Sequence, residues 1–144
     1  MYKWLLLVYK IPTEPSARRV YIWRKLKRLG AVLLHDAVWV LPANPRTQEQ
    51  FQWLAAEIIE MGGDALLWEG QLALVGQDEI LVQQFMVQVE NAYREILTEL
   101  EGDDVDLSAL SARYQQVRLE DYFQSELGQR VRAALLSAGG RVES

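Results

Sequence analysis

The sequence contains no cysteine and only one histidine, and these two shortages exclude several classes of functional site. Without cysteine there is no disulfide scaffold, no thiol nucleophile and no thiolate-bound zinc or iron–sulfur cluster. A single histidine excludes a histidine-rich metal cluster. No apolar run approaches the length that spans a bilayer, and the run from Trp4 to Tyr9 is too short for a signal sequence. We therefore expect a soluble, cytoplasmic protein with no cofactor and no metal.

Positive charge is abundant in only one part of the chain. Eight of the fifteen Lys and Arg residues lie in the first thirty positions, where Glu14 is the single acid. That segment carries +7, whereas the other 114 residues hold 7 basic and 19 acidic side chains and carry −12, which gives the overall −5. Such segregation creates a local field that attracts an anionic partner.

Apolar periodicity and turn residues predict six elements up to residue 76, in the order strand, helix, strand, strand, helix, strand. Their ranges are 2–11, 13–29, 31–34, 37–41, 47–61 and 65–75. This order predicts an α+β, ferredoxin-like βαββαβ antiparallel sheet with strand order 4-1-3-2 and both helices on one face. Three further helices are predicted beyond Gly76. We expect residues 1–76 to form the core and residues 77–144 to form a helical extension that packs on it as one structural unit.

The first predicted helix carries the candidate binding residues. At 100° per residue, Ile22, Trp23, Leu26 and Leu29 share one face, and most of the cations lie opposite. The candidate nucleic-acid or anion ligands are Arg18, Arg19, Arg24, Lys25, Lys27 and Arg28. Two interpretations are open: the cations contact phosphates, with a strong dependence on salt, or they form a solvated face paired with the protein's own acids.

Arg19 has two interpretations of its own. With Arg18 it lies beside the helix N-terminus, where the pair would hold an oxyanion such as phosphate, sulfate or chromate. Alternatively, Arg19 packs its stem on the sheet edge and pairs with a carboxylate, which is the interpretation that we favour.

Other candidate sites have simpler explanations. We interpret His35-Asp36 as turn residues of a hairpin, because adjacent side chains in a tight turn rarely form a base and its orienting acid. Asp103, Asp104 and Asp106 lack the spacing of a calcium loop and suit helix capping. Four of the five tryptophans lie in predicted core elements, which leaves Trp53 as the exposed one and a candidate partner surface.

The first 42 residues resemble the N-terminal domain of the chromate-resistance regulator ChrB. The motifs are the strand ending in Tyr9, Pro12, Glu14-Pro15-Ser16, Arg18, Trp23-Arg24, the exit at residues 27–31 and Leu41-Pro42; residues 113–123 resemble the closing part of that domain. More distant likenesses are to the ferredoxin-like CRISPR adaptation nuclease and to the C-terminal module of the repressor PaaX. The nuclease carries a metal-binding Asp where this chain has Tyr9-Lys10, and a lysine repels Mg²⁺.

The resemblance implies a binding protein rather than an enzyme. We expect a transcriptional regulator or accessory in chromate or oxyanion resistance, contacting duplex DNA or another polyanion through the basic first helix. A homodimer is expected, because such modules pair through sheet faces or edges. One alternative is a protein–protein adaptor that pairs with a separately encoded resistance-domain protein, and another is a degenerate metal-dependent nuclease. No membrane partner is expected.

Overall fold

The computed structural model describes residues 2–35 and 38–143. The chain divides into two compact units, Met1–Leu81 and Val82–Ser144. The elements of the first unit are β1 (Trp4–Lys10), α1 (Ser16–Arg28), β2 (Val32–Leu34), β3 (Val38–Pro42), α2 (Pro45–Glu60) and β4 (Asp64–Gly70). Helix α3 (Gln77–Leu100) begins in the first unit and continues into the second, where α4 (Leu107–Glu120) and α5 (Glu126–Glu143) follow.

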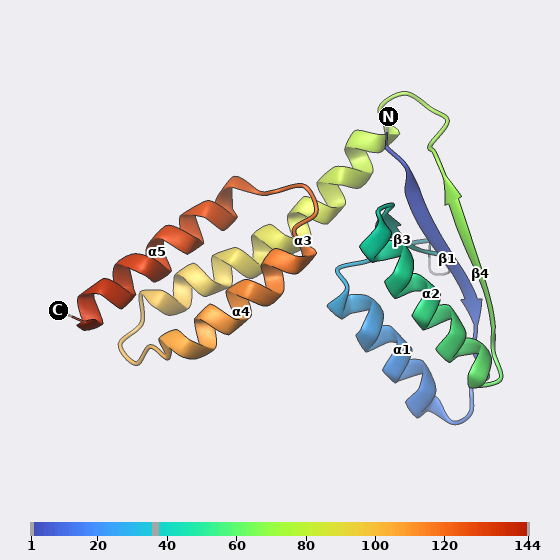
Figure 1. The fold of residues 1–144 in the computed structure, drawn as a ribbon, viewed down its shortest axis with the longest axis horizontal. Coiled ribbons are helices and arrows are strands. Elements are labelled where there is room, and N and C mark those ends of the chain that lie inside the picture. Colours follow the sequence, from blue (N-terminus) through green and yellow to red (C-terminus); the bar gives the residue numbers. More distant parts are fainter. Residues whose placement is uncertain (1, 36–37, 144) are drawn as a thin grey trace. The chain divides into compact units, whose positions relative to one another are not determined.

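The four strands form one antiparallel sheet in the order β2-β3-β1-β4, so the predicted strand order and the ferredoxin-like α+β fold are confirmed. Helices α1 and α2 lie side by side on one face of the sheet (Figure 1). The predicted hairpin joins β2 to β3. His35 has a left-handed backbone, with φ of 49°, which suits a turn, whereas Asp36 lies outside the described residues.

Strand register explains which side chains enter the core. Leu7 of β1 pairs with Trp39 of β3 on one face, and both are buried. The next pair along β1 and β4, Val8 and Leu66, points to the opposite face, because side chains alternate along a strand. On that face Leu66 and Trp68 are each 59% exposed. Within the first unit no layer covers this part of the sheet, so Trp68 does not enter the core of that unit, contrary to the prediction.

The bounds of all six elements of the first unit differ from their predicted ranges, and two of these differences are instructive. Helix α2 begins at Pro45, two residues early, because Asn44 and Thr47 form a capping box. The Asn44 Oδ1 accepts a hydrogen bond from the Thr47 N–H at 2.8 Å, and the Thr47 Oγ1 accepts one from the Asn44 N–H at 3.0 Å. Strand β4 ends at Gly70, so it is five residues shorter at this end than the strand expected up to residue 75.

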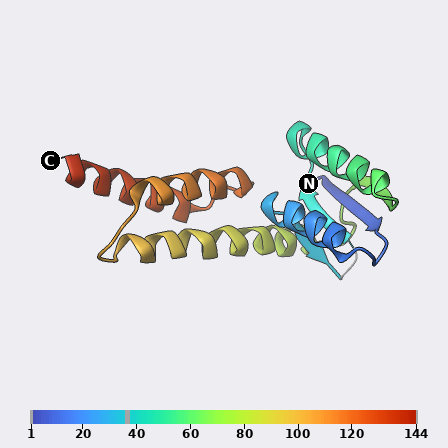
Figure 2. The same ribbon diagram turned by 90° about the horizontal axis from the view of Figure 1, so that it is seen from below.

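The second unit has its own core of apolar side chains from α3, α4 and α5, three helices that lie alongside one another (Figure 2). Within it, the Tyr93 hydroxyl donates a hydrogen bond to Asp121 at 2.9 Å. Asp106 caps α4 by accepting a hydrogen bond from the Ala109 N–H at 3.1 Å, as predicted. The packing of this extension on the sheet core stays a prediction. Among the described residues, no helix is long and apolar enough to cross a membrane.

Candidate anion-binding surface on helix α1

Two buried side chains fix the orientation of α1. Ile22 and Leu26 have no exposed surface, which anchors one side of the helix to the sheet. The helix starts after Pro15, whose backbone is extended, and ends before Gly30, whose φ of 76° suits a glycine. Basic residues fill its last turn, where they complement the negative end of the helix dipole. The remaining surface of α1 therefore faces solvent, α2 or the edge of the sheet.

Two of the six predicted ligands lie on the side of α1 next to α2. The Arg18 Nη1 donates a hydrogen bond to the Met61 carbonyl oxygen at 2.8 Å. The Lys25 Nζ lies 3.6 Å from the Glu57 Oε1, in an ion pair between the two helices. Lys25 is thus a cation paired with one of the protein's own acids, which is the second of the two interpretations. Arg18 is held by a hydrogen bond to a backbone carbonyl group.

Lys25 also contacts an aromatic ring. Its Nζ lies 5.2 Å from the centroid of the Tyr21 ring. A hydrogen bond with Tyr21 raises the pKa of Lys25, and the nearby Glu57 carboxylate adds to this effect. Lys25 is therefore charged at neutral pH, with part of its field cancelled by Glu57.

The outward side of α1 carries three more of the predicted ligands, Arg24, Lys27 and Arg28, and all three are exposed. The Lys27 Nζ lies 5.9 Å from the ring centroid of Trp23. No carboxylate among the described residues forms an ion pair with Arg24 or Lys27. These side chains form what we call the outer cationic face: Arg24, Lys27 and Arg28.

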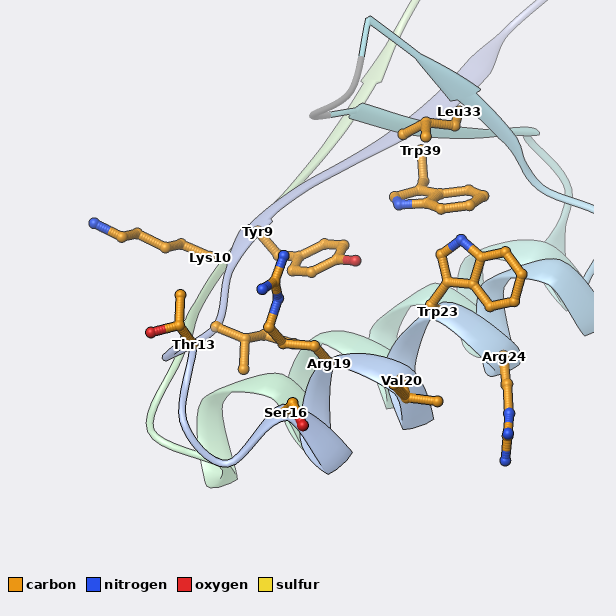
Figure 3. A pocket seen from close by; sticks show the side chains of 11 residues that line it. Tyr9, Lys10, Thr13, Ser16, Arg19, Val20, Trp23, Arg24, Leu33 and Trp39 are labelled. Carbon is orange, nitrogen blue, oxygen red and sulfur yellow. The ribbon is translucent and has the colours of Figure 1, made fainter.

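Arg19, the sixth predicted ligand, lies on the other side of α1 and lines a cavity against the sheet (Figure 3). Within the described part of the chain no carboxylate pairs with it, so the structure gives no support to the favoured pairing. Trp23 lines the same cavity and is 50% exposed, although we predicted that it enters the core. Trp23 lies at the margin of the buried stripe, beyond the part of α1 that Ile22 and Leu26 press onto the sheet.

Sequence reasoning placed all six cations on the correct helix but missed this cavity. The cavity combines α1 with the end of β1 and with the β2–β3 hairpin. One available signal was the recurrence of Tyr9, Trp23 and Trp39 in elements that a ferredoxin-like fold brings together. Trp53 is 68% exposed, as predicted, and lies on α2.

The described residues contain no group of three or more His, Asp or Glu side chains placed to hold a metal ion. At the end of β1, where the resemblance to the CRISPR adaptation nuclease would place a metal ligand, this chain has the exposed Lys10. Its cross-strand partner is Asp64 of β4. Among the described residues, the paired ends of β1 and β4 therefore offer one cation and one carboxylate, which are too few oxygen ligands for a hard metal ion.

Comparison with known proteins shows that the sequence of this chain matches one family. A family model described as "Protein ChrB, N-terminal" matches residues 19–101, more than half of the chain. The protein named Protein ChrB from Cupriavidus metallidurans is 30% identical to it over an alignment of 139 residues; the match covers 88% of this chain and 42% of that protein. The chain thus spans less than half the length of this curated relative. No solved structure gives a significant match.

Proposed function

Because this chain belongs to the ChrB N-terminal family, we propose that it is a regulatory binding protein of a chromate- or oxyanion-resistance system. In this proposal it contacts duplex DNA, or a polyanion of similar charge density, through the outer cationic face of α1. The observation that carries the proposal is the exposure of Arg24, Lys27 and Arg28 on one side of a rigidly anchored helix. The chain carries a net charge of −5, so this face is a local exception on an acidic protein.

The chemistry of this face matches a phosphate backbone better than a base edge. Lysine and arginine side chains that neutralise phosphates release condensed counterions, and this release supplies most of non-specific DNA affinity. Base reading requires an element that enters a groove, and phosphate contacts alone position a protein without specifying sequence. We therefore propose binding that depends steeply on salt and weakly on DNA sequence.

Several parts of the functional prediction extend beyond this site. The family relative is more than twice as long as the stretch that matches, so its activity and partners as a whole protein are not transferred to this chain. The predicted homodimer and the predicted pairing with a separately encoded resistance-domain protein stay predictions. The exposed Leu66 and Trp68 on the open sheet face are compatible with either partner.

Binding of a short duplex, followed by fluorescence anisotropy across a series of monovalent salt concentrations, tests the proposal. The Lys27→Ala, Arg28→Ala double variant should bind more weakly and flatten the slope of log K against log salt by up to about 1.8, since each phosphate contact contributes about 0.9. A matched control is the Arg130→Ala, Arg132→Ala double variant, which removes the same charge from exposed positions on α5. Equal effects of the two double variants, or no binding at low salt, would contradict the proposal.

A further inference from the structure

The cavity beside α1 has the size of a small-molecule site and lies entirely within the first unit. Its volume is about 770 Å³, within the range of roughly 300–1,000 Å³ that is usual for ligand pockets. The residues that line it come from β1, the loop after β1, α1 and the β2–β3 hairpin. They are Tyr9, Lys10, Ile11, Thr13, Ser16, Arg19, Val20, Trp23, Arg24, Leu33 and Trp39.

Three aromatic rings gather in this cavity. Figure 3 shows Trp39 facing Trp23 across the space, with the Tyr9 ring beside them and its hydroxyl directed toward the two indoles. Trp39 is buried, which holds it in place, whereas Trp23 keeps half of its surface accessible. An accessible indole that faces a fixed ring across an open space provides a platform on which a planar ligand stacks.

The charge of the cavity has one sign. Lys10, Arg19 and Arg24 line it, and none of its described lining residues is an Asp or a Glu. In Figure 3 the Arg19 guanidinium lies next to the Tyr9 ring, whereas Lys10 and Arg24 extend away from the rings. Arg19 is therefore the cation best placed to meet a ligand that stacks on Trp23, and a guanidinium binds phosphate or carboxylate oxygens in a planar, two-pronged geometry.

Neutral donors complete the surroundings of Arg19. Burial raises the pKa of Tyr9, against smaller opposite effects from the Trp39 side chain and the Arg19 charge, so its hydroxyl stays protonated and can donate to an anion. Ser16, the first residue of α1, also borders the cavity, at the positive end of the helix dipole. An anion next to Arg19 would thus meet a cation, a hydroxyl donor and a favourable dipole.

We propose that this cavity binds a nucleotide, with the base stacked on Trp23 and the phosphate held by Arg19. The aromatic surface alone suits any flat apolar ligand, and the cations alone suit any anion. Their combination in one cavity without a described carboxylate selects a ligand that is both planar and negatively charged. The nucleotide is either free or an unpaired residue of a nucleic-acid strand, because both present the same base and phosphate.

A titration with a nucleoside monophosphate tests the proposal directly. Binding is followed by NMR through the indole N–H resonances of the five tryptophans in a ¹⁵N-labelled sample. The resonances of Trp23 and Trp39 should shift, while those of the exposed Trp53 and Trp68 should stay in place and serve as internal controls. Inorganic phosphate and the uncharged nucleoside, used as separate probes, should each bind more weakly than the nucleotide. Uniform shifts of all indoles, or no shift, would overturn the proposal.

Variants separate stacking from charge. Trp23→Ala should weaken nucleotide binding roughly 5- to 150-fold, the range for loss of one base–aromatic stack. Trp23→Phe should restore much of the affinity, and Trp53→Ala should leave it unchanged. Arg19→Gln should bind the nucleotide no better than the nucleoside. Because Trp23 and Arg19 are exposed, the variants should keep the fold, which circular dichroism verifies. Unchanged binding by Trp23→Ala or Arg19→Gln would refute the assignment.

Two comparisons identify the source of the nucleotide and keep this inference distinct from the proposed function. If a single-stranded oligonucleotide shifts the same indole resonances and the mononucleotide displaces it, the natural ligand is an unpaired residue of a strand. If only the mononucleotide shifts them, the natural ligand is a free nucleotide. Both results support the cavity. The Arg28→Ala variant should retain nucleotide binding, whereas Trp23→Ala should retain salt-dependent duplex binding. Nucleotide binding without duplex binding would support the cavity and refute the proposed function.

Discussion

The Glu57 carboxylate should restrain the affinity of α1 for polyanions, so Glu57→Gln should strengthen duplex binding. The carboxylate lies on α2 and its Oε1 is 3.6 Å from the Lys25 Nζ, with side chains that are 32% and 47% exposed. An exposed pair of this kind is worth about 0.2–1 kcal/mol, so its loss should barely change the free energy of unfolding. Its loss should, however, release Lys25 to contact a phosphate beside the outer cationic face.

The expected gain follows from counterion release. One additional phosphate contact makes the slope of log K against log salt steeper by about 0.9, which corresponds to a gain of roughly eightfold at about 0.1 M monovalent salt and to no gain near 1 M. The gain should therefore decrease steadily as salt is added. A lysine side chain is protonated at neutral pH without any partner, so the released Lys25 stays charged.

Fluorescence anisotropy with a labelled duplex measures both quantities, and Glu49→Gln is the matched control. Glu49 is an exposed residue of the same helix, and its substitution changes the net charge equally without touching Lys25. If Glu49→Gln strengthens binding as much as Glu57→Gln, the effect comes from net charge and the role of the Lys25 pair is refuted. An unchanged slope for Glu57→Gln would show that Lys25 makes no phosphate contact.

Two further predictions concern the second unit. Tyr93→Phe removes the hydrogen bond to Asp121, so the free energy of unfolding in urea should fall by about 1.5–3 kcal/mol, the usual value for a bond to a charged group. Burial, with the Asp121 hydrogen bond, raises the pKa of Tyr93, so the unfolded chain releases this proton first. The contribution of Tyr93 to the free energy of unfolding is therefore complete below about pH 10 and is lost as the pH rises above that value. Between about pH 9 and 11 the wild type should lose more stability than Tyr93→Phe. Parallel losses in the two proteins would contradict this. Asp106→Ala removes the cap of α4 and should cost about 1 kcal/mol in the same assay, whereas Asp103→Ala, which substitutes an exposed neighbour, should cost much less.

The strand and helix pattern was predictable because each element of the first unit carries its own signal. The apolar run at the start of the chain predicts β1, and Pro12 marks its end. Gly30 marks the end of α1. The exposure of Trp23 and Trp68 was not predictable in the same way. Periodicity gives the phase of a side chain on its element, but the extent to which neighbouring layers cover that side is a property of the assembled fold.

The candidate site was predictable only in its composition. The six cations of α1 are visible in the sequence, but the sorting of Arg18 and Lys25 toward α2 depends on Met61 and Glu57, which lie more than thirty residues away. A helical wheel contains no information about the neighbouring helix. The cavity at Arg19 needed the register of β1 with β3, which brings Tyr9 and Trp39 to the same face of the sheet.

The central position of β1 has a consequence for synthesis of the protein. Strand β1 precedes its two partners in the chain, so it leaves the ribosome before β3 and before β4, the last strand of the sheet. Until residue 70 has emerged, one hydrogen-bonding edge of β1 has no native neighbour, and its apolar side chains are open to wrong associations. The nascent chain should therefore depend on chaperones during that interval, and truncated products that stop before β4 should aggregate rather than fold.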